Sequence, residues 1–175
     1  MISAIVLSPS LRAASPVARA GEAVARSLAM LVRLAVDGFL RDVAIVGPAG
    51  FDLAELAEHA GCAFIETASA RDGLRLAIER ARAEILLVLE GGFAPQSGFA
   101  DEAGDLLLEP GAFRGALLRL APNSLATRLA PALSPPVGAL AGRQASAKAA
   151  PKDLADLIRR LKIRRALNVR AQKLI

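Results

Sequence analysis

Residues 85–95 read Ile85-Leu86-Leu87-Val88-Leu89-Glu90-Gly91-Gly92-Phe93-Ala94-Pro95. Five apolar residues follow one another without interruption, and an acid and two glycines come directly after them. A continuous apolar run of this length is typical of a strand whose sheet is covered on both faces, as parallel sheets are. The sequence therefore predicts a buried strand that ends abruptly in a turn carrying Glu90.

Similar apolar runs precede this strand, and segments of helical periodicity separate them. We expect strands at 2–7, 43–46, 62–65 and 85–89, and helices at 17–36, 52–59 and 71–82. Ser15 and Pro16 predict the start of the first helix, and apolar residues at helical spacing extend to Leu40. Gly61 is predicted to be the C-terminal cap of the second helix. This alternation predicts an α/β fold with a parallel sheet and helices on its faces.

The pattern weakens after Pro110. Strands are expected at 112–120, 137–141 and 163–169, and helices at 123–133, capped by Asn123 or Ser124, and at 151–161. Residues 145–150 are alanine-rich and favour no structure strongly. Because no repeat and no long linker divides the chain, the 175 residues are expected to form a single domain.

The composition excludes several classes of protein. Hydrophobic residues make up 54% of the chain, including 38 alanines, which excludes disorder as the main state. No stretch of 18 residues lacks both charge and turn-forming residues, so a membrane-spanning helix is not expected. Cys62 is the single cysteine, which excludes an intrachain disulfide and argues against a cysteine metal cluster. No basic segment of a secretory signal precedes the first strand, and a cytoplasmic location is expected.

The net charge of +5 is unevenly distributed along the sequence. Residues 139–175 have a net charge of +8, whereas residues 1–138 have a net charge of −3. The most basic segment contains Arg159, Arg160, Lys162, Arg164 and Arg165. It could be a solvated helix face or a surface for anionic phospholipids at the inner face of the membrane. Nucleic acid is disfavoured as a partner, because the 3% of aromatic residues offer no platform for base stacking.

Common motifs of nucleotide-binding and hydrolytic enzymes are absent from the sequence. Neither a G-x-x-x-x-G-K-[ST] loop nor a G-x-G-x-x-G fingerprint follows the first strand. His59 is the single histidine, and without a G-x-S-x-G elbow it does not indicate a catalytic triad. Ligands of open α/β sheets bind at the carboxyl ends of the strands. Those ends are 8–10, 47–50, 67–69 and 90–92, which contain small residues, one acid and no pair of metal ligands.

Taken in order, these segments resemble the motifs of the family 2 glycosyltransferases. The similarity is carried by Ser8-Pro9-Ser10-Leu11, Val46-Gly47-Pro48-Ala49-Gly50, Ala70-Arg71-Asp72-Gly73, residues 85–95 and Lys152-Asp153-Leu154-Ala155-Asp156-Leu157. It covers nearly the whole chain and implies a single-domain, three-layer α/β sandwich of the nucleotide-diphospho-sugar transferase (GT-A, Rossmann-like) type. Residues 1–110 would then bind the nucleotide-sugar, and residues 111–175 would form the acceptor half with its basic tail.

The resemblance also implies a set of site residues. Donor contacts fall on Pro9, Ser10, Gly47, Arg71 and Glu90, and Asp153 takes the position of the acid that deprotonates the acceptor hydroxyl.

The family's most specific motif, Asp-x-Asp, is eroded here. Glu90 and Gly92 replace its two acids, and Gly47 replaces the acid that contacts uridine. A single carboxylate is a poor Mg²⁺ or Mn²⁺ ligand set, so either metal is expected only if Glu90 is still competent. We therefore expect a divergent glycosyltransferase-like protein with impaired or lost metal-dependent transfer. The alternatives are a non-catalytic binding or assembly module on this fold and a nucleotidyltransferase of the related fold. Nucleotidyltransferases open with a glycine-rich loop that contains arginine, and this sequence offers only Arg12 there.

Overall fold

The computed structural model describes residues 1–11, 19–50, 52–109, 113–130 and 133–174. Its strands are β1 Ile2–Leu7, β2 Leu40–Gly47, β3 Ala63–Glu66, β4 Ile85–Glu90, β5 Phe93–Pro95, β6 Ala116–Arg119, β7 Pro136–Gly142 and β8 Ala171–Lys173. Its helices are α1 Ala20–Val36, α2 Leu53–Ala60, α3 Ala70–Arg80, α4 Phe99–Leu108, α5 Leu125–Leu129, α6 Arg143–Ala149 and α7 Leu154–Arg160, and the 3₁₀ turn η1 spans Pro9–Leu11. Strands and helices alternate, which confirms the predicted α/β class.

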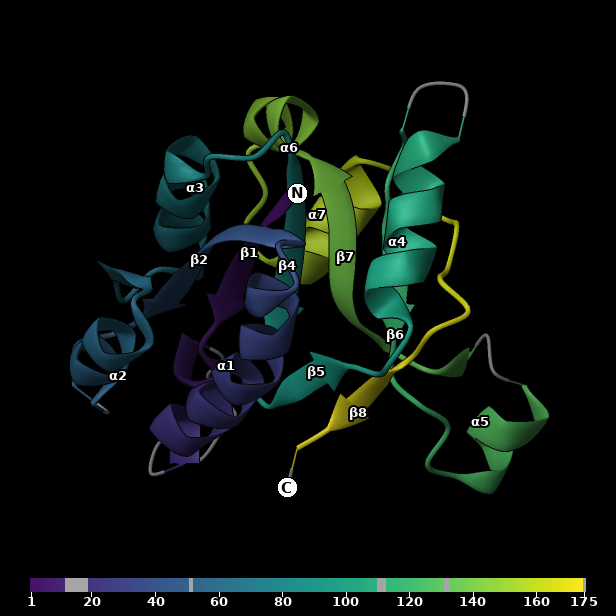
Figure 1. The fold of residues 1–175 in the computed structure, drawn as a ribbon, viewed down its shortest axis with the longest axis horizontal. Helices are drawn as coiled ribbons and strands as arrows, with labels where there is room; N and C mark the ends of the chain where they lie inside the picture. The colour runs from purple at the N-terminus through teal and green to yellow at the C-terminus, as the bar shows by residue number, and fades with distance from the viewer. Residues whose placement is uncertain (12–18, 51, 110–112, 131–132, 175) are drawn as a thin grey trace.

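The central sheet has six strands in the order β3-β2-β1-β4-β7-β6. β1 pairs in parallel with both β2 and β4, and β2 pairs in parallel with β3, as predicted for the first half of the chain. β7 runs antiparallel to both of its neighbours, β4 and β6. A second, two-stranded sheet of β5 and β8 lies beyond the carboxyl end of β4 (Figure 1).

Helices cover both faces of the central sheet and complete three layers (Figure 1). On one face, Val24 of α1 and Phe99 of α4 belong to the same buried cluster as Leu87 of β4. On the other face, helices α3 and α7 cover the sheet, and Leu157 belongs to the same cluster as Val88. Because successive side chains of a strand point to opposite faces, both faces of β4 are apolar. This explains the uninterrupted apolar run in the sequence.

Helix α1 ends at Val36, where the predicted helix ends, but Leu40 does not continue its apolar pattern. Gly38 adopts a left-handed conformation with φ +72°, and the chain leaves the helix there. Leu40, predicted as an apolar position of the helix, instead begins β2. That prediction is wrong because a glycine turn overrides helical periodicity. Gly61 does cap α2, with φ +65°, as predicted, whereas the start predicted at Ser15 and Pro16 lies outside the described residues.

Residues 163–169 do not form the predicted strand. They pair with β6 at one isolated bridge, where the Leu117 N–H donates to the Arg165 carbonyl at 2.8 Å and the Leu167 N–H donates to the Leu117 carbonyl at 2.9 Å. Ile163 and Leu167 are nevertheless buried, and their burial explains the apolar pattern. This segment contributes buried side chains to the core, and regular strand pairing occurs only farther along the chain, between β8 and β5.

Helix α4 and strands β5 and β8 have no counterpart among the predicted elements, and α6 covers the alanine-rich stretch. Helices α4 and α6 begin after Gly98 and Gly142, which have no side-chain oxygen to signal a helix start. Helix α5 begins after Ser124, whose hydroxyl accepts from the Thr127 N–H at 3.2 Å, as predicted. None of the described helices is long and apolar enough to cross a membrane.

Candidate functional site

A cavity with a volume of about 370 Å³ lies at the carboxyl ends of β1 and β4. Its walls come from η1, the first turns of α1, the turn between β4 and β5, the amino-terminal ends of α3 and α7, and the end of β8. Small side chains such as those of Ser8, Ala23 and Ala70 leave the space open. The cavity therefore occupies the place where open α/β sheets bind their ligands.

Hydrogen bonds fix the glycine turn at the base of this cavity. The Gly91 N–H donates to the Leu7 carbonyl at 2.8 Å. The Gly92 N–H donates to the hydroxyl of the buried Ser27 at 2.9 Å, and that hydroxyl in turn donates to the Phe93 carbonyl at 2.9 Å. A Cβ atom at residue 91 would lie 3.0 Å from Cδ of a neighbouring proline in η1. Packing of the turn against β1, η1 and α1 therefore requires small residues here.

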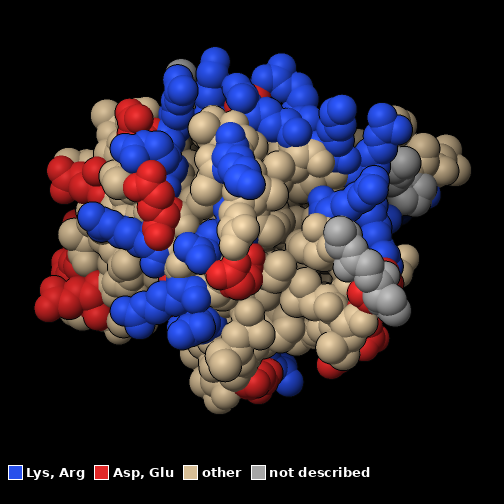
Figure 2. Space-filling model, turned by 90° about the horizontal axis from the view of Figure 1, so that it is seen from above, with Lys and Arg blue, Asp and Glu red and all other residues tan. Residues whose placement is uncertain are grey.

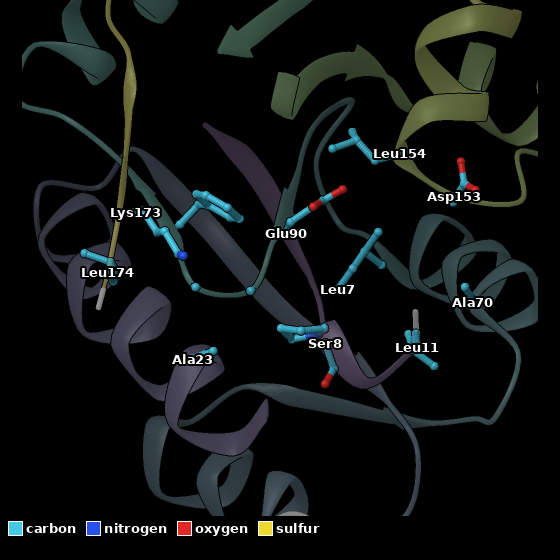
Figure 3. Close-up of a pocket in the computed structure, with 14 residues that line it drawn as sticks. Leu7, Ser8, Leu11, Ala23, Ala70, Glu90, Asp153, Leu154, Lys173 and Leu174 are labelled. Carbon is cyan, nitrogen blue, oxygen red and sulfur yellow. The ribbon is translucent and has the colours of Figure 1, made fainter. Parts of the chain in front are cut away.

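Two carboxylates reach the cavity from different elements. Glu90 is half-buried at the end of β4, and its side chain points toward the α7 end of the cavity, where Asp153 and Leu154 lie (Figure 3). Asp153 is exposed and is the N-cap of α7, because its Oδ1 accepts the Asp156 N–H at 2.7 Å. Its carboxylate thus stabilises the helix start and faces the cavity rim at the same time.

Lys173 reaches the opposite side of the cavity from the last strand. β8 pairs antiparallel with β5, which sets Lys173 opposite Phe93. The Leu174 N–H also donates to the Gly92 carbonyl at 2.8 Å. In Figure 3 the Lys173 side chain lies across the cavity from Asp153. Lys173 is not among the predicted site residues, because a strand of three residues has no periodicity to reveal it.

The structure brings together only some of the residues that the resemblance implies. Pro9, Glu90 and Asp153 line the cavity, and the Ser10 hydroxyl lies 2.7 Å from that of Ser8 beside it. Arg71 is exposed on α3, where the preceding alanine lines the cavity instead. The roles of these residues toward a donor stay predictions.

Gly47 lies below the cavity in a space that is already filled. A Cβ atom at this position would lie 2.5 Å from Cδ1 of the fully buried Leu53 and 3.0 Å from Cβ of Ser8. An acid at position 47 would therefore require these neighbours to move. This packing disfavours an acid at the position where the resemblance implies a contact with uridine.

The residues present do not fit the divalent metal that the resemblance implies. Within the described ranges, no group of three His, Cys, Asp or Glu side chains is placed to hold a metal ion. Mg²⁺ and Mn²⁺ require several oxygen ligands, and Mg²⁺ demands near-ideal octahedral geometry. Glu90 is followed by two glycines, and Asp153 is engaged as a helix cap. We therefore derive no chemical step through a metal.

The basic C-terminal segment is partly neutralised by ion pairs. Arg159 and Arg160 both bind the carboxylate of Asp156, which is 6% exposed, and the Arg160 Nε–Oδ2 distance is 2.6 Å. The hydrogen bond from Arg159, with further bonds from the Lys152 N–H and Arg160, holds the pKa of Asp156 well below its usual range.

Arg165 is paired as well, because its guanidinium binds Glu109, and this hydrogen bond lowers the pKa of that carboxyl. Lys162 and Arg164 are exposed and form no ion pair within the described part of the chain. Figure 2 shows Lys and Arg side chains gathered along one margin of the molecule. Five cations form the surface that was predicted to bind anionic lipid, and of these Lys162 and Arg164 have no ion-pair partner among the described residues.

Comparisons with known proteins find this fold and no close relative. No family model and no curated protein sequence matches the chain. A mannosyltransferase from Pyrobaculum calidifontis, solved with GDP-Man and Mn²⁺, superposes with a TM-score of 0.68 at 12% identity, over 99% of this chain and 56% of that one. HddC from Yersinia pseudotuberculosis superposes with a TM-score of 0.64 at 8% identity, over 99% and 93%.

An inositol-1-phosphate CTP transferase from T. maritima gives a TM-score of 0.59 at 11% identity, over 99% of this chain and 89% of that one. At such identities the likeness establishes the fold alone. The chain is an α/β protein with the fold of the nucleotide-diphospho-sugar transferases, which glycosyltransferases and nucleotidyltransferases share.

Proposed function

We propose that the chain is a divergent glycosyltransferase-like protein that binds a nucleotide-diphospho-sugar in this cavity, with metal-dependent transfer impaired or lost. The observation that carries the proposal is the cavity itself. Its volume of about 370 Å³ lies within the usual range for small-molecule sites, with two carboxylates on one side and Lys173 on the other. The carboxyl ends of β1 and β4 are also where this fold leaves room for a ligand.

Asp153 is the candidate base for sugar transfer. In the direct displacement that the resemblance implies, the acceptor oxygen bonds to the anomeric carbon while the bond from that carbon to the diphosphate oxygen breaks. The acceptor proton passes to the carboxylate of Asp153, and the nucleoside diphosphate leaves. A base must lie within hydrogen-bond reach of the proton it takes. The exposed position of Asp153 on the cavity rim is compatible with this role.

A non-catalytic binding module is the second candidate. Its supporting observation is that several motif positions have structural roles: Asp153 caps α7, the turn at Gly91 and Gly92 packs against β1 and α1, and Gly47 leaves no room for a side chain. A nucleotidyltransferase has the same fold, but its glycine-rich opening loop is missing from the sequence.

A thermal-shift titration tests nucleotide binding. UDP and GDP are added at millimolar concentrations, once with EDTA and once with Mn²⁺. A ligand that binds the folded chain raises the melting temperature by mass action. We expect one of the two to stabilise the chain equally under both conditions.

A cavity-filling variant supplies the specificity control. Ala70→Phe should abolish the shift, because residue 70 lines the cavity, whereas Ala145→Phe on the exposed side of α6 should keep it. If neither nucleotide shifts the wild type, the proposal is wrong. If only the Mn²⁺ series shows a shift, the assignment of a metal-free site is wrong.

A further inference from the structure

We infer that Arg19, Arg26 and Lys173 form a cationic subsite that neutralises the diphosphate of the nucleotide in place of a divalent metal. The inference rests on the proposed function and extends it. In a metal-dependent transferase the metal ion balances the charge of the leaving diphosphate. Because the donor set around Glu90 does not fit such an ion, that charge needs another partner within reach of the cavity.

A groove next to the cavity supplies this partner. It is lined by Arg19, Glu22, Ala23, Arg26, Lys173 and Leu174, and its volume is about 570 Å³. Ala23, Lys173 and Leu174 also line the cavity, so the groove and the cavity share this wall and lie side by side at the first turns of α1. In Figure 3 these three residues lie on the side of the cavity away from Asp153. A ligand with its sugar near Asp153 would therefore extend its phosphates toward the groove.

The groove has an excess of positive charge. It contains three cations and one acid, Glu22, whose carboxylate pairs with Arg26 one helical turn away. Within the described residues, neither Arg19 nor Lys173 forms an ion pair. Their positive charges are therefore available to phosphate oxygens. Arginine binds phosphate through its planar fork, and lysine binds it as a compact point charge.

The backbone holds these cations in fixed relative positions. Ala23 and Arg26 lie on one face of α1, since they are three residues apart, and Arg19, the N-cap residue, lines the same groove. Between the two arginines, the Ala23 carbonyl accepts the Gly92 N–H at 3.1 Å. The Gly92 carbonyl accepts the Leu174 N–H, which anchors the backbone next to Lys173. Helix α1, the glycine turn and β8 are thus joined directly, which fixes the backbone positions from which these cations reach the groove.

Isothermal titration in EDTA tests the subsite with five probes: UDP, GDP, uridine, guanosine and inorganic pyrophosphate. The variants are Arg19→Gln and Lys173→Gln, and Arg33→Gln, in the exposed last turn of α1, is the matched control. We expect each of the first two to weaken binding of the nucleoside diphosphate and of pyrophosphate by about tenfold, as loss of one charged hydrogen bond does. Nucleoside binding and the melting temperature should not change, and Arg33→Gln should behave like the wild type.

The outcomes separate the subsite from the proposed function. If a nucleoside diphosphate binds and neither variant weakens it, the subsite is wrong and the proposed function stands. If pyrophosphate binds through Arg19 and Lys173 but no nucleoside adds affinity, the anion subsite stands and the proposed nucleotide function falls. If no probe binds in EDTA but UDP or GDP binds with Mn²⁺, the subsite is overturned, because the metal then carries the phosphate. If nothing binds under either condition, both proposals are overturned.

Discussion

Lys173 lies directly opposite Phe93 in the antiparallel pair that β8 forms with β5. Through this pair, a cation far along the sequence stands beside the turn that follows Glu90, at the end of β4. Each of these strands has only three residues, so it is their pairing that holds Lys173 beside the turn. The pairing, together with the bond from the Leu174 N–H to the Gly92 carbonyl, makes Lys173 and Leu174 part of the cavity wall.

Asp153 can be tested for its two roles separately. Asn is as good an N-cap as Asp, so Asp153→Asn should leave the free energy of unfolding within a few tenths of a kcal/mol, whereas Asp153→Ala should lower it by about 1 kcal/mol. If the carboxylate is also the base, both variants should lose any sugar transfer that the wild type shows. Urea denaturation and release of nucleoside diphosphate measure the two effects. Transfer that survives in Asp153→Asn would exclude the base role.

Gly73 and Gly104 form a matched pair of helical glycines with opposite surroundings. A Cβ atom at residue 73 would collide with side-chain methyl groups of Val46 and Thr67, so Gly73→Ala should destabilise the chain by about 1–3 kcal/mol despite better helix propensity. At residue 104 a Cβ atom meets nothing within 4 Å, and Gly104→Ala should stabilise by about 0.5–1 kcal/mol. Urea denaturation of both variants checks the difference. Equal effects would mean that α3 does not pack on β2 as described.

Asp156 should make the chain sensitive to acid. Its pKa is lower in the folded chain than its ordinary value of 3.8, because Arg159, the Lys152 N–H and Arg160 bind the ionised carboxylate. The stabilisation is therefore complete above the unfolded pKa and is lost as the pH falls below about 4. The free energy of unfolding, measured by urea denaturation between pH 6 and about pH 2.5, should fall more steeply for the wild type than for Asp156→Asn. Parallel curves would contradict this coupling.

Four of the five cations of the basic segment should fall into two classes when their charge is reversed. Arg159→Glu with Arg160→Glu should lower the melting temperature, because it leaves the buried Asp156 without partners. This corrects the view of those arginines as simply solvated charges. Lys162→Glu with Arg164→Glu should leave the melting temperature nearly unchanged, because exposed unpaired charges contribute little.

The second pair also tests the membrane proposal. If the segment docks on anionic lipid, the wild type should sediment with phosphatidylserine vesicles at low salt. Lys162→Glu with Arg164→Glu should abolish sedimentation with the vesicles. Salt should weaken the binding of the wild type, because the Debye length falls from about 10 Å at 0.1 M to about 3 Å at 1 M. A wild type that stays in the supernatant at low salt would end the membrane proposal.

Local signals in the sequence predict much of the fold. The run before Glu90 and the cap at Gly61 are determined by neighbouring residues, and both elements form as predicted. Helix α4 was missed because Gly98 starts it without a capping side chain. The missed strands and the wrong strand at 163–169 share another cause. Their pairing partners lie far away in the sequence, so periodicity could not reveal where the backbone would bond.

The residues of the candidate site also differ in whether local sequence could reveal them. Pro9, Glu90 and Asp153 were found because each lies in or directly after a motif whose order along the chain is preserved. Lys173 was not identified, since only the β5–β8 pair brings it to the cavity. Ser27 was not identified at all, although its hydroxyl holds the glycine turn, because its role depends on the packing of α1 against that turn.

The backbone conformation at Gly92 limits which residues this turn can accept. Its φ of +91° is a conformation that residues with a side chain rarely adopt, and its N–H is already bonded to α1. An aspartate placed there would strain the backbone of the turn, although its Cβ atom would make only an ordinary contact, 3.4 Å from Cβ of Ala23. The turn is therefore selective for glycine at this position. A substitution that adds a carboxylate here would change the shape of the base of the cavity before it could change what the cavity binds.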